Sequence, residues 1–234
     1  GIVMKRTLFI SLLSSILSLQ LNAQVDEDKL GAWYMYFFNA KFGESPIGFQ
    51  GDIQYRNWNL GGDLEQLLLR GGINFQPEGS RARFTLGYAH ITTGAMGEST
   101  ATTMESRIYQ EAMLPHQPLN RVYLTHRYRY EQRFVEDQDF RTRYRYALFM
   151  SIPFNKSSVE KNAVYLALYN ELFINGQREI GEGRTVELFD RNRTYLGLGY
   201  GITDQLRVQA GWMKQVTDNW GKGQLQLSLH HRLF

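Results

Sequence analysis

The sequence predicts an all-β fold, a single antiparallel transmembrane β-barrel preceded by a cleavable signal peptide. The first observation is a period of two between residues 127 and 150, where arginines alternate with aromatic or aliphatic residues. Side chains two apart lie on the same face of a strand. The pattern recurs along most of the chain, and its apolar half is rich in Tyr, Phe and Leu. It therefore indicates a barrel with an apolar face toward lipid and a polar face toward an enclosed lumen.

The second observation is the amino-terminal leader. Lys5 and Arg6 precede an apolar stretch at 8–21, and the small residue Ala23 follows it. This order is typical of a secretory signal peptide, with cleavage after Ala23. An uncleaved anchoring helix is the alternative, but the stretch is shorter than the roughly 20 residues that span a bilayer, and it contains serines and a glutamine. The chain is thus divided into a leader at 1–23 and a barrel at 24–234.

The third observation is that no later segment is long and apolar enough for a transmembrane helix, so a membrane-embedded chain has to form a closed barrel. Mean hydropathy is −0.39 although aromatic residues make up 14%, as expected when every second residue of a strand is polar. The chain has no cysteine, which excludes disulfides, thiolate metal sites and thiol nucleophiles. A net charge of +3 is too small to indicate nucleic-acid binding.

Alternation and turn residues delimit eleven strand candidates, in order along the chain. They are 31–42, 47–58, 64–75, 81–93, 104–114, 121–134, 139–154, 162–175, 191–201, 205–216 and 222–234. The first is aromatic on both faces, so its orientation is not readable, and 139–154 is the longest. Segment 104–114 also fits a helix, but a turn at 115–120 would join it to the next candidate as a hairpin, which favours a strand.

The number of strands follows from a general rule. Single-chain bacterial barrels have an even number, so the prediction is twelve strands, with one more near 184–189. Ten is the alternative, if 104–114 does not span the membrane. A soluble β-sandwich has similar strand spacing, but soluble sandwiches rarely carry so many arginines on one strand face.

A series of short motifs resembles a known family. The motifs are LGAWYMY at 30–36, QYRN at 54–57, DLEQLLLR at 63–70, ESRIYQ at 105–110, HRYRYEQRF at 126–134, YNELF at 169–173 and FDRNR at 189–193. In this order they resemble the domain of unknown function 2490 family of exported proteins, mostly from Bacteroidota. The resemblance covers nearly all of the mature chain and implies an outer-membrane barrel. It implies no substrate or catalytic residue, because the family has no established activity.

The residues at the predicted lumenal parity are mostly arginines, accompanied by a few carboxylates. They are Arg56, Arg70, Arg83, Arg107, Arg127, Arg129, Arg133, Arg141, Arg143, Arg145, Arg193 and Arg207, with Asp52, Glu65, Glu105, Glu131 and Glu171. Glu65 has the wrong parity in its own strand, so its inclusion stays open. One interpretation is an Arg–Glu lattice that braces or plugs a narrow barrel. The other is a basic lumen that binds or passes anions, which the excess of arginine supports.

An outer-membrane enzyme acting on lipid or peptide is the alternative function. His90 and His126 fall on lipid-facing rows, without a serine two or three residues away. The acidic cluster at 136–139 is typical of a solvated loop. His230 and His231 are adjacent on a strand and cannot easily share a metal ion. The sequence therefore predicts no catalytic residue, no metal and no cofactor.

We therefore expect a monomeric, non-enzymatic protein in the outer membrane of a Gram-negative bacterium, acting as a structural scaffold or as a narrow anion-preferring channel. The expected partners are outer-membrane lipids and lipopolysaccharide, small anions, and the barrel-assembly machinery during biogenesis. Nucleic acid is not among them.

Overall fold

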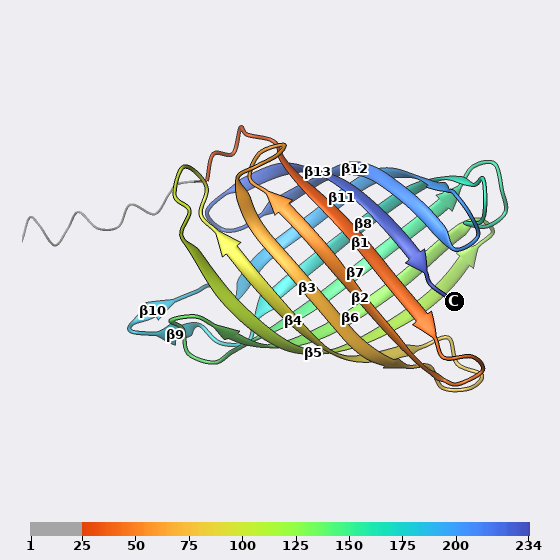
Figure 1. Cartoon of the computed structure of the whole chain (residues 1–234), viewed down its shortest axis with the longest axis horizontal. Coiled ribbons are helices and arrows are strands. Elements are labelled where there is room, and N and C mark those ends of the chain that lie inside the picture. The colour runs from red at the N-terminus through yellow and green to blue at the C-terminus, as the bar shows by residue number, and fades with distance from the viewer. Residues whose placement is uncertain (1–24) are drawn as a thin grey trace, which may run out of the picture.

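The computed structural model of this protein describes residues 25–234, so the predicted leader at 1–23 lies outside the described residues. The described chain forms eleven long strands that close into one barrel, together with a short two-stranded ribbon (Figure 1). The all-β fold and the closed barrel are confirmed. Within residues 25–234, no helix is long and apolar enough to cross a membrane.

The strand bounds follow the alternating segments of the sequence. They are β1 Gly31–Lys41, β2 Ile47–Asn57, β3 Leu64–Phe75, β4 Arg83–Gly94, β5 Thr102–Leu119, β6 Val122–Val135, β7 Arg141–Pro153, β8 Val164–Asn175, β9 Glu179–Gly181, β10 Arg184–Thr185, β11 Phe189–Gly201, β12 Leu206–Val216 and β13 Gly221–Arg232.

Strands adjacent in sequence pair antiparallel around the barrel, and β8 pairs directly with β11. The barrel closes where β1 meets β13, and this pair is parallel. We call the end where β1 begins the amino rim and the end where β13 finishes the carboxyl rim. The ribbon of β9 and β10 projects from the amino rim, at the opposite end from the carboxyl terminus (Figure 1).

The predictions of twelve strands, or of ten, are wrong, because the described barrel has eleven. Near 184–189, where a twelfth was expected, β10 covers only Arg184 and Thr185 and pairs with β9 alone. Segment 104–114 lies within β5 and pairs with both β4 and β6. The rule that bacterial barrels have an even number of strands therefore gave a wrong count in both versions of the prediction. The eleven strand candidates read from alternation correspond to the eleven barrel strands.

The longest strand is β5, with 18 residues, and not the predicted segment 139–154. Its pairing with β4 ends at Met113, whereas its pairing with β6 continues to Leu119. Pro115 lies in this extension, where β5 pairs with β6 alone, and a proline is tolerated at such an edge. The predicted turn at 115–120 therefore shrinks to residues 120–121, where Arg121 takes a φ of 65°.

The two faces of the wall differ in chemistry. Apolar side chains are exposed on the outside, as at Leu86, which is 60% exposed, and Leu198, which is 57% exposed. Toward the lumen the buried side chains are mainly polar or charged, and only two small apolar clusters occur among the described residues. One of these clusters packs Trp33, Tyr165 and Tyr195 together. The lumenal side chains are thus held mainly by polar contacts and not by a continuous apolar core.

Glycines on the lumenal face make room for tyrosine rings. A Cβ atom added at Gly199 would overlap the ring of Tyr165, and one added at Gly87 would overlap the ring of Tyr109. Both tyrosines are buried, so each ring covers its glycine. On β11, Gly199 thus admits the large ring of its neighbour Tyr165. These contacts hold the rings beside the wall instead of across the lumen.

Candidate functional site

The predicted lumenal charges lie inside the barrel, on strands β2 to β8 and on β11, with one on β12. Nine of the arginines are buried, and so are all five carboxylates. Arg83 and Arg127 are half-buried, and Arg207 is exposed at the carboxyl rim. The buried arginines are Arg56, Arg70, Arg107, Arg129, Arg133, Arg141, Arg143, Arg145 and Arg193, and the carboxylates are Asp52, Glu65, Glu105, Glu131 and Glu171.

Glu131 is the centre of the charge network. Its side chain is 0% exposed and faces three guanidinium groups. Arg143 donates to Oε1 from Nε at 2.8 Å, and Arg107 and Arg145 each donate to Oε2 from Nη1 at 3.1 Å. One carboxylate therefore joins side chains from β5, β6 and β7.

Like charges that face each other across neighbouring strands are separated by carboxylates. Arg107 and Arg133 are direct partners in the β5–β6 register, and Glu105 accepts hydrogen bonds from both of them. The Nε of Arg133 lies 2.8 Å from Glu105 Oε2. Directly facing like charges destabilise a sheet. Glu105 offsets the repulsion between Arg107 and Arg133 that this register would otherwise create.

Two further carboxylates extend the network around the wall. Glu171 accepts from Arg145 Nε and Nη2, each at 3.1 Å, and also from Arg127. Glu111 accepts from Arg129 Nε at 2.9 Å. We call this continuous set of ion pairs the lattice. Its members are Glu105, Arg107, Glu111, Arg127, Arg129, Glu131, Arg133, Arg143, Arg145, Glu171 and Asp190.

Two β-bulges place additional acids among the arginines. The β2–β3 register skips Glu65, and the β8–β11 register skips Asp190. A bulge re-aims side chains and breaks the strict alternation of faces. Glu65 is consequently buried and accepts the Trp33 indole N–H at 2.9 Å. Asp190 pairs with Arg143 at 3.0 Å and with Arg191 at 3.0 Å.

Glu111 and Asp190 belong to the site but are absent from the lumenal set inferred from the sequence. Glu111 shares the parity of Arg107 on β5, so alternation alone could have identified it. Asp190 could not be identified this way, because the bulge interrupts the alternation at that residue. Lys222, a fully buried cation on the lumenal parity of β13, was missed as well, so the missed residues add two acids and one cation to the lumen.

Aromatic rings stabilise the arginines that crowd together. Phe173 is fully buried, and three guanidinium groups lie over its ring. The distances from the guanidinium carbon to the ring centroid are 4.9 Å for Arg143, 4.3 Å for Arg145 and 4.6 Å for Arg193. A cation over an aromatic face is attracted by the ring quadrupole, so Phe173 supplements the carboxylates.

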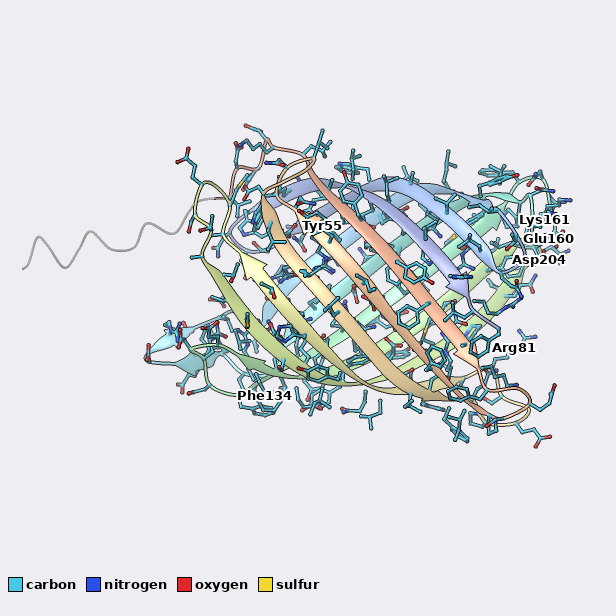
Figure 2. The ribbon with its side chains drawn as sticks, in the orientation of Figure 1. Tyr55, Arg81, Phe134, Glu160, Lys161 and Asp204 are labelled. Atoms are coloured by element: carbon cyan, nitrogen blue, oxygen red, sulfur yellow. The ribbon has the colours of Figure 1, made fainter. Side chains whose placement is uncertain are left out.

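A cavity of about 600 Å³ occupies the part of the lumen that the lattice leaves free. Glu160 and Asp204 border it at the carboxyl rim, where Figure 2 labels both residues beside Lys161. Its inner end is lined by Trp33, Arg56 and other arginines. The lattice residues nearest the amino rim, such as Glu105 and Arg143, are not part of its wall. The cavity therefore runs from the carboxyl rim to Trp33 and Arg56, near the strand ends of the amino rim, while Glu105 and Arg143 pack a part of the lumen outside it.

Comparison with known proteins places this barrel in a family. A family model described as a protein of unknown function, DUF2490, matches residues 30–226. The chain belongs to the DUF2490 family. The match runs from just before β1 into β13, so the family unit is the barrel itself. No curated protein and no solved structure matches the chain.

One serine–histidine pair lies in the cavity of this DUF2490 barrel and was missed in the sequence. Ser228 Oγ and His230 Nε2 are 2.9 Å apart, and both residues line the cavity. A nucleophilic pair of this kind needs a third group that orients the base. The residue opposite His230 in the β12–β13 register is the cation Arg207 and not a carboxylate. The pair therefore lacks the arrangement of a catalytic triad.

The remaining histidines and acids form no metal centre. His231 faces away from His230 and bonds the hydroxyl of Tyr36 through Nδ1 at 2.8 Å. Within residues 25–234, no group of three or more His, Cys, Asp or Glu side chains is arranged to hold a metal ion. Glu136 and its acidic neighbours lie exposed in the loop between β6 and β7.

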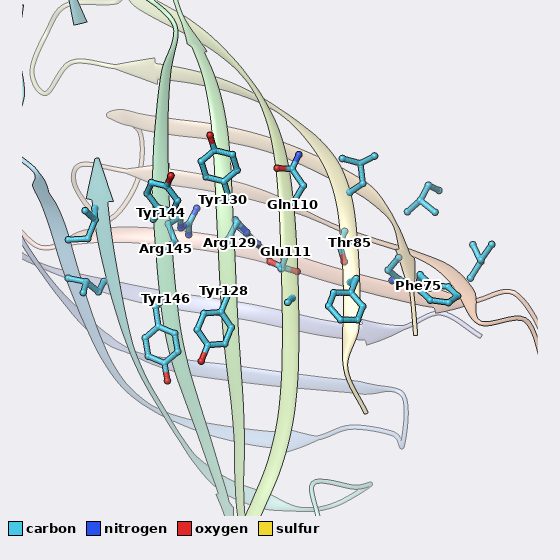
Figure 3. Close-up of a pocket in the computed structure, with 18 residues that line it drawn as sticks. Phe75, Thr85, Gln110, Glu111, Tyr128, Arg129, Tyr130, Tyr144, Arg145 and Tyr146 are labelled. Atoms are coloured by element: carbon cyan, nitrogen blue, oxygen red, sulfur yellow. Dashed lines mark hydrogen bonds and ion pairs between the residues drawn. The ribbon is translucent and has the colours of Figure 1, made fainter. Parts of the chain in front are cut away.

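The outer face of the DUF2490 barrel carries a shallow apolar hollow of about 810 Å³, shown in Figure 3. Two tyrosine pairs stand on β6 and β7 there, with ring centroids 5.1 Å apart for Tyr128 and Tyr146 and 5.0 Å apart for Tyr130 and Tyr144. Arg129 lies between two of these tyrosines in sequence and is buried on the other side of the wall (Figure 3). The hollow therefore belongs to the apolar exterior and not to the charged lumen.

Proposed function

We propose that this DUF2490 protein is a non-enzymatic, monomeric β-barrel of the outer membrane of a Gram-negative bacterium, and that its lumen is braced and closed by its own charges. It acts as a structural scaffold and not as an open pore. The observation that carries this proposal is the lattice, which ties β5, β6, β7, β8 and β11 together through buried ion pairs.

Two features support the membrane location. The exposed apolar side chains follow the outward parity of nearly every barrel strand, as at Ile73, Leu86, Tyr144 and Leu198. Soluble proteins rarely expose contiguous apolar surface on this scale. The leader predicted at the amino terminus would export the chain, and a closed barrel is the β structure that satisfies its backbone in lipid.

The burial of the lattice supports a closed lumen. A side chain that lines a water-filled pore is exposed to water, but Glu131 is 0% exposed and Arg107 is 4% exposed. Bidentate pairing of guanidinium and carboxylate groups fixes such side chains in place. The lattice thus closes the lumen on the side of β5 to β8.

A second candidate is a narrow anion-preferring channel. The arginines in the lumen outnumber the carboxylates, and Arg56 has no carboxylate oxygen within 4 Å among the described residues. A confined excess of guanidinium groups is how anion pores select. Conduction would require part of the lattice to open.

Fractionation and bilayer recordings test the proposal together. The mature chain should appear in the outer-membrane fraction and migrate as a heat-modifiable band. In a planar bilayer it should show no single-channel conductance, whereas the Arg143→Ala/Arg145→Ala variant should conduct, because it removes two partners of Glu131.

Three results would overturn parts of this proposal. Recovery as a soluble periplasmic protein contradicts the membrane location. Anion-selective conductance of the unaltered barrel, reduced by neutralising Arg129, Arg143 and Arg145, favours the channel. Hydrolysis of added phospholipid or peptide that is lost in Ser228→Ala favours the enzyme alternative.

A further inference from the structure

The cavity beyond the lattice combines guanidinium groups that lack a carboxylate at hydrogen-bond distance with an aromatic wall. We propose that it binds a small molecule in which an oxyanion, a phosphate or a carboxylate, is joined to an apolar body, and that Arg56 and Arg193 hold the oxyanion. This inference goes beyond the scaffold proposed above, because a plugged barrel needs no ligand.

Arg56 and Arg193 are buried cations whose hydrogen bonds go to neutral amides. Arg56 donates from Nε to Gln54 at 3.0 Å, and Arg193 donates from Nε to Gln215 at 2.8 Å. The nearest carboxylate oxygen to Arg193 is Glu171 Oε1, at 4.0 Å. Arg56 has no ion pair among residues 25–234 within that distance. Burial of a charge is costly unless it is paired, so an anion at this position would be stabilised.

Both guanidinium groups lie over the same aromatic ring. The guanidinium carbon is 3.7 Å from the Trp33 ring centroid for Arg56 and 4.8 Å for Arg193. The indole N–H of Trp33 is bonded to Glu65, which makes no ion pair within 4 Å with either arginine. Trp33 thus lies against two like charges at the inner end of the cavity, and an oxyanion placed there would be attracted by both.

The carboxylates inside the cavity are already paired with other arginines. Asp52 pairs with Arg70 at 3.0 Å, Glu111 pairs with Arg129, and Glu171 pairs with Arg145. They cannot also neutralise Arg56 and Arg193 at hydrogen-bond distance.

Further lining donors remain without a partner. The Nε atoms of Arg83 and Arg127 are buried and make no hydrogen bond within the described chain. Both side chains line the same cavity, nearer the carboxyl rim. A buried donor without a partner costs free energy. Arg127 is neutralised by Glu171, so Arg83 is the one of the two whose charge adds to the positive field that an anion would meet.

One wall of the cavity is aromatic. The rings of Phe149 and Tyr169 lie 5.5 Å apart, and Tyr169 stacks on Tyr195 at 4.8 Å. A Cβ at Gly197 would overlap Tyr195, so this ring also rests over a glycine. The cavity of about 600 Å³ is in the range of small-molecule sites. An inorganic ion would leave most of it empty, and the aromatic wall therefore indicates an apolar body attached to the anion.

The loop between β7 and β8 narrows the entrance. Val159 packs against the apolar cluster inside the barrel, and the backbone of Glu160 lies against Gly201, where a Cβ would overlap its carbonyl oxygen. The loop is held by a hydrogen bond from Tyr123 Oη to the Ser157 carbonyl at 2.6 Å and by one from Lys161 N to an aspartate on the β11–β12 loop. Val159 and Glu160 line the cavity, so a large residue at position 159 should block access.

Calorimetric titration of the purified mature barrel in non-ionic micelles tests the inference. The probes are phenyl phosphate, benzoate, inorganic phosphate and benzyl alcohol. Phenyl phosphate or benzoate should bind at least tenfold more tightly than inorganic phosphate and benzyl alcohol. Only phenyl phosphate and benzoate join an oxyanion to an apolar ring. Comparison of the first two identifies the oxyanion as phosphate or carboxylate.

Three variants locate the site. Arg193→Gln should weaken binding of the better probe about tenfold or more, because it removes a charge-assisted contact. Val159→Trp lies outside the lattice and should abolish binding by filling the entrance. Arg178→Gln, in an exposed ion pair beside the ribbon, is the control and should bind like the unaltered protein. A heat-modifiable band confirms that each variant is folded.

The inference is overturned if neither phenyl phosphate nor benzoate binds, if inorganic phosphate binds as tightly as they do, or if folded Arg193→Gln and Val159→Trp bind normally. The outcome is separate from that of the scaffold proposal. Binding without conductance supports both, and conductance without binding contradicts both. A barrel that neither binds nor conducts overturns this inference alone.

Discussion

At the scale of single residues, each buried charge of the lattice depends on an oppositely charged partner. A buried ion pair contributes little net stability, because desolvation offsets the attraction, but loss of one partner leaves the other charge buried and unpaired. Glu131 is the extreme case, since three guanidinium groups depend on one fully buried carboxylate. Removal of its charge should therefore cost much more than removal of a surface acid.

We expect Glu131→Gln to lower the free energy of unfolding by about 3–5 kcal/mol, the usual cost of breaking a buried pair. Glutamine keeps the size and the acceptor oxygen, so the loss reports the charge. The measurement is urea unfolding of the barrel in lipid vesicles, followed by tryptophan fluorescence. The control is Glu187→Gln, whose pair with Arg178 is exposed and should cost at most about 1 kcal/mol. Equal losses in the two variants would show that the lattice is not a brace.

At the scale of elements, the wall depends on positions where two strands approach closely. Tyr165 of β8 covers Gly199, its direct partner on β11, and the ring occupies the space of a side chain at 199. Gly71 of β3 is the matched opposite case, because a Cβ there would meet nothing within 4 Å. The packing of the wall therefore requires a glycine at position 199 but leaves room for a side chain at position 71.

Gly199→Ala should destabilise the barrel by about 1–3 kcal/mol, the range for overpacking. Gly71→Ala should leave stability unchanged or raise it slightly, because alanine costs less backbone entropy. The temperature at which the folded band converts to the unfolded band on a gel gives the comparison. If Tyr165→Ala did not reduce the effect of Gly199→Ala in the double variant, the ring would not be the cause.

Alternation was sufficient to predict the strands and most of the lumenal charges, because residues two apart in a strand lie on the same face of the barrel wall. It placed Arg129 and Arg145 on the parity that the structure buries. It failed at Asp190, where a bulge that no residue type signals shifts the parity. Strand number was mispredicted because the even-number rule concerns other barrels, whereas closure depends on whether β13 can pair with β1.

At the scale of the whole molecule, the outer face decides where the barrel can exist. Its apolar rows continue around the wall, and they include Leu86, Leu198 and Leu227. In lipid these rows are the solvated surface, and in water they would be a large aggregation-prone patch.

Replacement of Leu86, Leu198 or Leu227 by arginine should cost about 2–4 kcal/mol if the site lies at mid-membrane, and less near the rims. Leu60→Arg is the control, because Leu60 is exposed in the loop between β2 and β3. Unfolding in vesicles of the four variants gives the comparison. If all four variants were as stable as the unaltered barrel, the outer face would not be in contact with lipid.

The parallel pairing of β1 with β13 has a consequence for sidedness. With eleven strands in the described chain, β1 begins at one rim and β13 ends at the other. In a membrane the segments that lead into β1 and out of β13 would therefore lie in different compartments. In a barrel with an even number of strands, the two terminal segments would lie in the same compartment. An epitope tag ahead of β1 and a tag after β13 should then differ in whether an antibody reaches them on intact cells, and one end of the polypeptide has to cross the bilayer during assembly.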